Sequence, residues 1–361
     1  MHWLGKYSLL IGVVLVFGLV PTGCSNSGSS GEKRIILLTN GNSPFWDAGR
    51  AGLEEAEKDL KLHDAGLRAV MDVNDGTPKG QLDKLQQYVS QSDIVAVGVS
   101  AIDANNAAIA DQLRELQNKG VHVVTVDSDV DREKMRDARF AYLGTDNWAG
   151  GVELGKCIKN LRSAGGQYVT FVGRTGAQNA IERVGGVKEG AGDKFKALDN
   201  MGDDNDRIKA RENVRNAIRN HPNLNVVVGI WSYNAPAIVD VVKELDKRQA
   251  LTVVAFDAEP IAVDQMSEGM IDAMVVQNPY QMGYQGVRLM KALFEKDQKT
   301  IQELLPDKGK KPDGDIFDTG LKVVVPDEGS PLKREMFDPK TQFLKLSEFR
   351  QWLAKYHLTG S

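Results

Sequence analysis

Cysteine is scarce in this chain, whose 361 residues include only two, Cys24 and Cys157. Two cysteines allow one disulfide at most, so a fold stapled by several disulfides is excluded. Cys157 stands beside Leu154 and Ile158 in a helical pattern of apolar residues. This setting predicts a buried, unreactive thiol.

No excess of basic charge is present either. Lys and Arg total 45 against 49 for Asp and Glu, a net charge of -4, and there is no long basic run. The sequence therefore lacks the electrostatic footprint of a nucleic-acid-binding protein. Hydrophobic residues at 42% and charged residues at 26% are average for soluble globular domains, which argues against both disorder and a polytopic membrane protein.

The common catalytic and cofactor motifs are also missing. The sequence contains no Gly-x-Ser-x-Gly elbow, no His-Glu-x-x-His and no dinucleotide-binding glycine fingerprint followed by a suitable acid. Its five histidines are scattered. We therefore predict no enzyme activity, no cofactor and no metal.

The N-terminal segment has the features of an export signal. Lys6 precedes an apolar run from Leu9 to Val20, which is too short to span a bilayer as a stable helix but suits the core of a signal peptide. The run ends in Val20-Pro21-Thr22-Gly23-Cys24, which resembles a bacterial lipobox. The resemblance implies that residues 1–24 are a signal peptide with a lipobox-like end, in which cleavage directly before Cys24 leaves this cysteine acylated as the mature N-terminus. The alternative is signal cleavage nearby without acylation. The Ser- and Gly-rich residues 25–33 are predicted to form a flexible tether.

After the tether, short β-branched runs alternate with longer amphipathic segments. This alternation is typical of βαβ units and indicates an α/β fold with parallel sheets. The predicted strands are Arg34–Thr39, Leu67–Val73, Ile94–Val99, His122–Val126, Phe140–Leu143, Gln167–Val172, Asn225–Gly229, Thr252–Phe256, Ala273–Gln277 and Leu321–Val325. The predicted helices include Trp46–Leu60, Ala107–Lys119, Ala149–Leu161, Asp206–Asn220, Ala235–Asp246 and Leu346–Leu358.

Ten strands are more than one compact sheet needs. We therefore expect two doubly wound lobes with about five strands each. The stretch from Asp307 to Asp318 is rich in Lys, Asp, Pro and Gly, and we expect it to be an exposed loop.

Ligands of open α/β sheets bind beyond the carboxyl ends of the strands. The segments that follow the predicted strands here are rich in aromatic rings, carboxylates and amides: Asn40–Trp46, Asp127–Asp129, Trp231–Asn234, Asp257–Glu259 and Asn278–Tyr280. Aromatic rings cover the apolar faces of a sugar, and carboxylates, amides and arginine bond its hydroxyls. The inventory indicates a sugar site.

Several of these segments resemble, in their order and spacing, the type I periplasmic binding proteins of the ribose-binding kind. The segments are Ser43-Pro44-Phe45-Trp46, Val124-Thr125-Val126-Asp127, Gly144-Thr145-Asp146-Asn147, Asn179-Ala180-Ile181-Glu182-Arg183, Asp206-Arg207, Val254-Ala255-Phe256-Asp257 and Gln277. The resemblance implies an N-terminal lobe of residues 34–145 plus 278–318 and a C-terminal lobe of residues 146–277 plus 319–361. It also implies a multi-strand hinge that crosses near Thr145, Asn278 and Asp318.

The resemblance assigns roles to individual residues. Phe45 and Trp46 match an aromatic pair on the sugar, Asp127 matches a carboxylate that accepts two hydroxyls, and Phe256 matches a stacking ring. The full set of expected ligand-binding residues is Ser43, Phe45, Trp46, Asp127, Thr145, Asn147, Arg183, Asn205, Trp231, Asn234, Phe256, Asp257 and Gln277. Gly98 and Trp231 stand where the ribose-binding pattern has Asn, and Asn234 is a substitute for the second. A pentose, a hexose, a polyol and a small diol all remain open as ligands.

Each of these residues also has a structural interpretation. Trp46 could pack in the core, Asp127 could be a turn residue, Asp257 could cap the helix that begins near Pro260, and Arg183 could pair with acids on a solvated face. The acidic stretch Asp203–Asp206 is predicted to cap a helix, because it lacks the spacing of a calcium-binding loop.

Taken with the export signal, the resemblance implies the extracytoplasmic, lipid-anchored sugar-binding subunit of an ABC-type importer. The expected partners are a small sugar or polyol, the permease subunits of the transporter and, through Cys24, the membrane; we expect a monomer. Two alternatives stay open: a ligand-sensing subunit that docks to a receptor, and an exported α/β enzyme in which Asp127 and Asp257 act as a glycosidase pair. A repressor of similar core fold is disfavoured, because the place of its helix-turn-helix holds the export signal.

Overall fold

The computed structural model describes residues 31–361. The expected signal peptide, Cys24 and residues 25–30 of the expected tether lie outside the described residues. Lys33, which we expected to end the tether, is instead the first residue of strand β1.

The described residues form two sheets. Their strands are β1 Lys33–Leu38, β2 Leu67–Asp72, β3 Ile94–Val99, β4 His122–Val126, β5 Tyr142–Gly144, β6 Gly166–Val172, β7 Phe195–Gly202, β8 Val226–Gly229, β9 Thr252–Phe256, β10 Ala273–Val276, β11 Ile316–Asp318, β12 Lys322–Val325 and β13 Gln342–Lys345. The first sheet has the order β11-β5-β4-β3-β1-β2, and the second has the order β13-β12-β10-β9-β8-β6-β7. Both sheets are parallel, except that β10 and β12 of the second sheet pair antiparallel.

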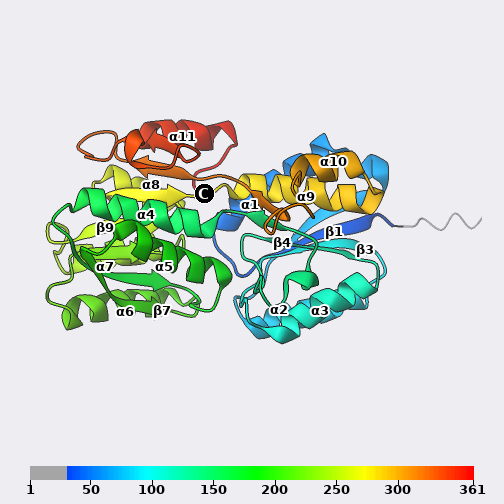
Figure 1. The fold of residues 1–361 in the computed structure, drawn as a ribbon, viewed down its shortest axis with the longest axis horizontal. Helices are drawn as coiled ribbons and strands as arrows, with labels where there is room; N and C mark the ends of the chain where they lie inside the picture. Colours follow the sequence, from blue (N-terminus) through cyan, green and yellow to red (C-terminus); the bar gives the residue numbers. More distant parts are fainter. Residues whose placement is uncertain (1–30) are drawn as a thin grey trace, which may run out of the picture. The chain divides into compact units, whose positions relative to one another are not determined.

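Helices cover both faces of each sheet, and Figure 1 shows these layers. The helices are α1 Phe45–Asp59, α2 Pro78–Val89, α3 Ala107–Asn118, α4 Asn147–Leu161, α5 Gln178–Ala191, α6 Arg207–Asn220, α7 Asn234–Glu244, α8 Pro260–Ser267, α9 Pro279–Glu295, α10 Gln298–Leu304 and α11 Leu346–Lys355. Strand β1 illustrates the resulting core, since Ile35 and Leu37 pack on one face of the sheet and Ile36 and Leu38 pack on the other. Because the strand is buried on both faces, its sequence is a continuous run of apolar residues.

The chain passes between the two sheets at three places. Residues 145–146 join β5 to α4, residues 277–278 join β10 to α9, and residues 319–321 join β11 to β12. We call the first sheet with α1, α2, α3, α9 and α10 the N-lobe, and the second sheet with the remaining helices the C-lobe.

Several expectations about the fold are confirmed. All ten predicted strands are present, with ends within two residues of those expected, and the fold is α/β with two doubly wound lobes. Cys157 is fully buried and free, and burial raises the pKa of its thiol.

Among residues 31–361, no helix combines the length and apolar character needed to cross a membrane.

Other expectations were wrong. The sheets contain six and seven strands rather than about five, because β7, β11 and β13 were not predicted. The expected exposed loop from Asp307 to Asp318 ends in β11, which pairs with β5 at the edge of the first sheet. All three missed strands lie at sheet edges, where half-exposed polar residues replace the continuous apolar run of an interior strand.

Candidate functional site

A cavity of about 150 Å³ lies between the two lobes, a volume comparable to that of protein cavities that hold a single six-membered ring. Each lobe contributes half of its lining. The N-lobe provides Asn40, Gly41, Asn42, Ser43, Phe45, Trp46, Asp75, Gly76 and Asp127, and the C-lobe provides Asn179, Arg183, Asn205, Arg207, Trp231, Ser232, Tyr233, Asp257 and Gln277.

Two buried carboxylates face this cavity from equivalent places. Asp127 follows the last residue of β4 and Asp257 follows the last residue of β9, and both have a φ of 65°. A left-handed conformation is uncommon for a residue with a side chain, but Asp tolerates it better than most. At both places this conformation turns the backbone away from the sheet directly after the strand. The Asp side chain can then enter the space between the lobes.

Asp127 is held by groups of its own lobe. Its Oδ2 accepts hydrogen bonds from Ser100 Oγ at 2.8 Å and from Asn40 Nδ2 at 3.4 Å. Burial raises the pKa of Asp127 above its usual value, against the opposing effects of Arg183 and Ser100.

Arg183 is the buried cation of the C-lobe. Its Nη1 lies 3.8 Å from Asp257 Oδ2 and donates to the carbonyl of Ile230 at 3.1 Å, while its Nε donates to Asn147 Oδ1 at 2.9 Å. Its guanidinium also lies 3.9 Å from the centre of the Phe256 ring. These contacts fix the guanidinium on the C-lobe side of the cavity.

Asp257 has a second partner in Gln277, whose Nε2 donates to both carboxylate oxygens at 3.1 and 3.0 Å. Burial raises the pKa of Asp257 to about 7, with Arg183 and Gln277 opposing the shift and Asp127 adding to it.

Two polar atoms of these cavity residues are buried without a hydrogen-bond partner among the described residues. They are Arg183 Nη2, a donor, and Gln277 Oε1, an acceptor. An unpaired buried polar atom costs about 1–3 kcal/mol. Six further unpaired side-chain atoms are buried elsewhere in residues 31–361, so what distinguishes these two is that their residues line the cavity. A ligand with both donor and acceptor groups would satisfy the two atoms.

Aromatic pairs line the cavity from both lobes. Phe45 and Trp46 meet edge to face with ring centres 5.1 Å apart, and Trp46 Nε1 donates to Asn40 Oδ1 at 3.1 Å. In the C-lobe, Trp231 and Tyr233 meet at 6.5 Å. The Trp231 ring needs Gly173 beneath it, because a Cβ there would lie 2.2 Å from the ring.

The acidic stretch before α6 divides into separate roles. Asp206 caps α6 as expected, its Oδ1 accepting from the backbone of Ile208 and Lys209. Asp203 is buried, and its carboxylate accepts from Tyr233 Oη and Asn234 Nδ2, so it orients the wall of the cavity. No group of three or more metal-ligating side chains occurs among residues 31–361.

Nine of the thirteen expected site residues line this one cavity: Ser43, Phe45, Trp46, Asp127, Arg183, Asn205, Trp231, Asp257 and Gln277. Thr145, Asn147, Asn234 and Phe256 do not line it. Three of these four support it from behind: Asn147 and Phe256 hold Arg183, and Asn234 Oδ1 accepts from the backbone N–H of Trp231 at 3.0 Å.

The structure also decides between the structural interpretations. Arg183 is 1% exposed and so does not lie on a solvated face, and Asp257 does not cap α8, whose N-cap is Glu259. Trp46 both packs in the N-lobe core and lines the cavity. Gly98 lies inside β3 against Met290 and Val126, so it does not mark the end of the strand near the site. That position belongs to Ser100.

The other lining residues were not among the thirteen expected ligand-binding residues. Seven of them lie in segments that the sequence analysis had singled out, namely Asn40, Gly41, Asn42, Asn179, Arg207, Ser232 and Tyr233. Sequence reasoning missed the remaining two altogether. Asp75 and Gly76 follow β2, and applying the strand-end rule there would have found them. Arg207 begins α6, after the strand β7 that was not predicted. Arg207 pairs with Glu259 at 3.0 Å at the rim of the cavity.

A comparison with known protein families identifies the family of this chain. A family model described as a periplasmic binding protein domain matches residues 35–298, more than two thirds of the chain. The chain belongs to the periplasmic binding protein family. Proteins of this family act outside the cytoplasm, which is therefore the location of this member.

Curated relatives of this periplasmic binding protein share low sequence identity with it, but the similarity covers most of both chains. The D-allose-binding periplasmic protein of Escherichia coli is 24% identical over 279 residues, which cover 75% of this chain and 88% of the relative. A ribose import binding protein of Bacillus subtilis is 24% identical over 283 residues, covering 77% and 87%.

Solved structures show the same fold. An ABC transporter solute-binding protein from Burkholderia graminis, solved with D-arabinose, matches this periplasmic binding protein with a TM-score of 0.70 at 23% identity, covering 82% of this chain and 96% of that one. A solute-binding protein from Agrobacterium vitis with bound D-fucose matches with a TM-score of 0.70 at 21% identity, covering 81% and 95%.

Proposed function

We propose that this chain is the extracytoplasmic sugar-binding subunit of an ABC-type importer, and that its two lobes close around one small monosaccharide or related polyol. The relatives and structural neighbours named above are binding proteins for such sugars or were solved with them. In the proposed complex, Asp127 and Asp257 accept hydrogen bonds from sugar hydroxyls, and Arg183 donates hydrogen bonds to them. The rings of Phe45, Trp46 and Trp231 cover the apolar faces of the sugar.

One observation carries the proposal. Arg183 Nη2 and Gln277 Oε1 are buried beside two carboxylates in a cavity of small-molecule size, and neither atom has a partner among residues 31–361. A sugar hydroxyl both donates and accepts, so a ring carrying several hydroxyls is suited to this mixed set. Charged partners make the stronger hydrogen bonds, about 1.5–3 kcal/mol each.

The same geometry favours binding over turnover. Asp127 and Asp257 both contact groups of the protein that hold them in place, and Asp257 is bonded twice by Gln277. Their part in the proposal is that of hydrogen-bond acceptors, and no chemical step is required.

The remaining parts of the proposal concern the assembly. The sequence at Cys24 supports attachment to the membrane through an acylated N-terminus, although this residue lies outside the described residues. The partner would be the permease of the transporter, to which a single liganded copy of the chain delivers its sugar.

A thermal-shift screen against monosaccharides and polyols tests the function. We expect at least one sugar to raise the melting temperature of the wild-type protein and Asp257→Ala to abolish that rise, because the variant loses a charged acceptor that contributes about 1.5–3 kcal/mol. The matched control is Asp246→Ala, since Asp246 also has a positive φ, of 50°, but is exposed and does not line the cavity. If no sugar shifts the wild type, or if Asp257→Ala responds as the wild type does, the proposed function is wrong.

A further inference from the structure

An ion pair joins the two lobes outside the cavity. Arg132, in the N-lobe segment between β4 and β5, donates through Nη1 to Glu182 Oε1 of α5 in the C-lobe at 3.0 Å. The two side chains are 21% and 15% exposed. Neither residue lines the cavity, but Glu182 is the direct neighbour of Arg183 in the chain.

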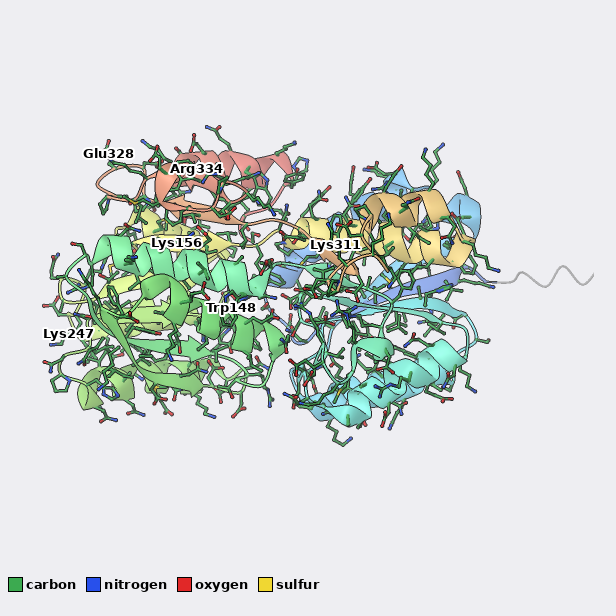
Figure 2. The ribbon with its side chains drawn as sticks, viewed as in Figure 1. Trp148, Lys156, Lys247, Lys311, Glu328 and Arg334 are labelled. Atoms are coloured by element: carbon green, nitrogen blue, oxygen red, sulfur yellow. The ribbon has the colours of Figure 1, made fainter. Side chains whose placement is uncertain are left out.

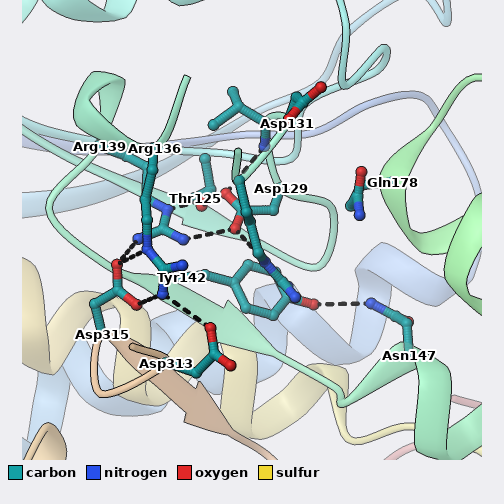
Figure 3. Close-up of polar contacts among 12 residues, drawn as sticks. Thr125, Asp129, Asp131, Arg136, Arg139, Tyr142, Asn147, Gln178, Asp313 and Asp315 are labelled. Atoms are coloured by element: carbon teal, nitrogen blue, oxygen red, sulfur yellow. Dashed lines mark hydrogen bonds and ion pairs between the residues drawn. The ribbon is translucent and has the colours of Figure 1, made fainter. Parts of the chain in front are cut away.

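The N-lobe half of this pair is built in advance. Arg132 Nε donates to Asp129 Oδ2 at 2.9 Å, and the same buried carboxylate accepts two bonds from Arg139, at 3.0 and 2.7 Å. Arg139 in turn bonds Asp315, which precedes β11. Figure 3 shows this chain of carboxylates and guanidiniums. Burial opposes the ionisation of Asp129, yet Arg139 and Arg132 hold its pKa below the usual value.

Arg132 is also packed against a ring that touches the binding site. Its guanidinium lies 4.8 Å from the centre of the Tyr142 ring. Tyr142 Oη lies 3.0 Å from the carbonyl oxygen of Asp127. It accepts from Asn147 Nδ2 at 3.1 Å, a contact that Figure 3 shows. Asn147 Oδ1 accepts from Arg183. Tyr142 and Asn147 therefore connect Arg132 to one cavity residue in each lobe, Asp127 in the N-lobe and Arg183 in the C-lobe.

The C-lobe half is oriented by its own helix. Gln178, one turn earlier on α5, donates from Nε2 to Glu182 Oε1 at 3.0 Å. Both charges are therefore positioned by their own lobes before they meet, so little side-chain entropy is lost when the pair forms.

We propose that Arg132 and Glu182 form a latch between the lobes, which stabilises the closed state and sets how long the bound sugar stays. The proposal rests on the proposed function for its ligand, and both residues act as positioning residues that do not touch the sugar. Opening the lobes would separate the two charges, because the network around Arg132 belongs to the N-lobe and Glu182 moves with α5. A contact made only in the closed state slows dissociation without slowing association.

The first test measures sugar kinetics by stopped flow, with the sugar found to shift the wild type. We expect Arg132→Gln and Glu182→Gln each to raise the dissociation rate about tenfold while the association rate stays within about twofold. The double variant should dissociate no faster than the faster single variant, because one interaction is lost in all three. The control is Arg215→Gln, which breaks an ion pair with Glu244 inside the C-lobe and should leave both rates unchanged.

The second test needs no ligand. The backbone N–H of Ala104 in the N-lobe donates to the carbonyl of Gly176 in the C-lobe at 3.2 Å, so separation of the lobes would break this bond and speed its hydrogen exchange. In the unliganded protein we expect faster exchange at Ala104 in Arg132→Gln than in the wild type, and no change in Arg215→Gln.

These results separate the two proposals. Wild-type dissociation rates in both single variants, multiplied effects in the double variant, or unchanged exchange at Ala104 would each overturn the latch while leaving sugar binding in place. A wild type that binds no sugar would overturn the proposed function, and the exchange measurement would still decide the latch.

Discussion

Asp257 carries the most consequential single charge of the cavity. Its pKa of about 7 in the folded chain lies well above the value of about 3.9 for an unperturbed Asp, because burial disfavours its ionised form. Between these two pH values the folded protein binds more protons than the unfolded chain. The stabilisation linked to this proton is therefore complete below about pH 4 and is lost as the pH rises through about 7.

We accordingly expect the melting temperature of the unliganded wild type to fall between pH 5 and pH 8, and to fall less in Asp257→Asn. Asn tolerates the left-handed backbone and carries no charge at any pH. A residual slope should remain in the variant, because burial also raises the pKa of Asp203 to about 6. Differential scanning calorimetry across this range checks the prediction, and equal slopes in the two proteins would contradict it.

Single residues of the site were predictable where a strand ends in an acid. Val126-Asp127 and Phe256-Asp257 each place a carboxylate directly after an apolar strand, and both carboxylates line the cavity. Phe256 was predicted to face the ligand but packs in the C-lobe core under Arg183. The sequence cannot distinguish a ring on the sugar from a ring one layer deeper, because both are buried aromatic residues at the end of a strand.

At the scale of elements, α4 and α5 are packed through glycines. Added Cβ atoms at Gly151 and Gly186 would meet backbone oxygens of the facing helix at 2.2 and 2.3 Å, those of Arg183 and Trp148 respectively. Trp148, labelled in Figure 2, lies in the first turn of α4 and donates from Nε1 to Glu189 of α5 at 2.9 Å. This close approach sets the position of Arg183 relative to the rest of the C-lobe.

Gly151→Ala should therefore impair both stability and binding. We expect a loss of about 1–3 kcal/mol in the free energy of unfolding, because the methyl group meets backbone that cannot rotate away, and a smaller sugar-induced shift, because Arg183 moves with α5. Denaturant unfolding with and without sugar measures both effects. The control is Gly286→Ala in α9, where the nearest atom to an added Cβ is 3.9 Å away; there we expect no loss and a gain of up to about 1 kcal/mol from helix propensity. A stable Gly151→Ala with full sugar response would refute this role for the helix pair.

Every interior strand was predicted from the sequence, whereas three of the four edge strands were missed and only the edge strand β2 was found. The interior strands β8 and β9 are buried throughout, and their apolar runs mark them without ambiguity. The edge strand β7 has the sequence FKALDNMG, in which charged and polar residues alternate with few apolar ones. Its pairing with β6 depends on tertiary contact rather than on local pattern, and no reading of a single sequence contains that contact.

For the whole molecule, the three crossings are the places where the lobes can turn relative to each other. Gln277 lies in the crossing between β10 and α9 and also lines the cavity. A ligand that bonds Gln277 is therefore attached to the hinge itself, as well as to Asp127 on one lobe and Arg183 on the other. A ligand can bond all three residues only when the lobes are close together. Binding of the ligand therefore favours closure of the lobes.

We expect the sugar identified by thermal shift to reduce the radius of gyration of the protein in small-angle X-ray scattering. The liganded population should match the arrangement in which Asn205 Nδ2 and Arg174 Nη2 both donate to the carbonyl of Gly76 in the other lobe, at 3.0 and 3.1 Å. Asp257→Ala supplies the control, since the same sugar concentration should leave its scattering unchanged. A sugar that raises the melting temperature of the wild type without compacting it would contradict closure of the lobes on binding. In that case closure could not be the signal that a permease recognises, because bound and free proteins would present the same pair of surfaces.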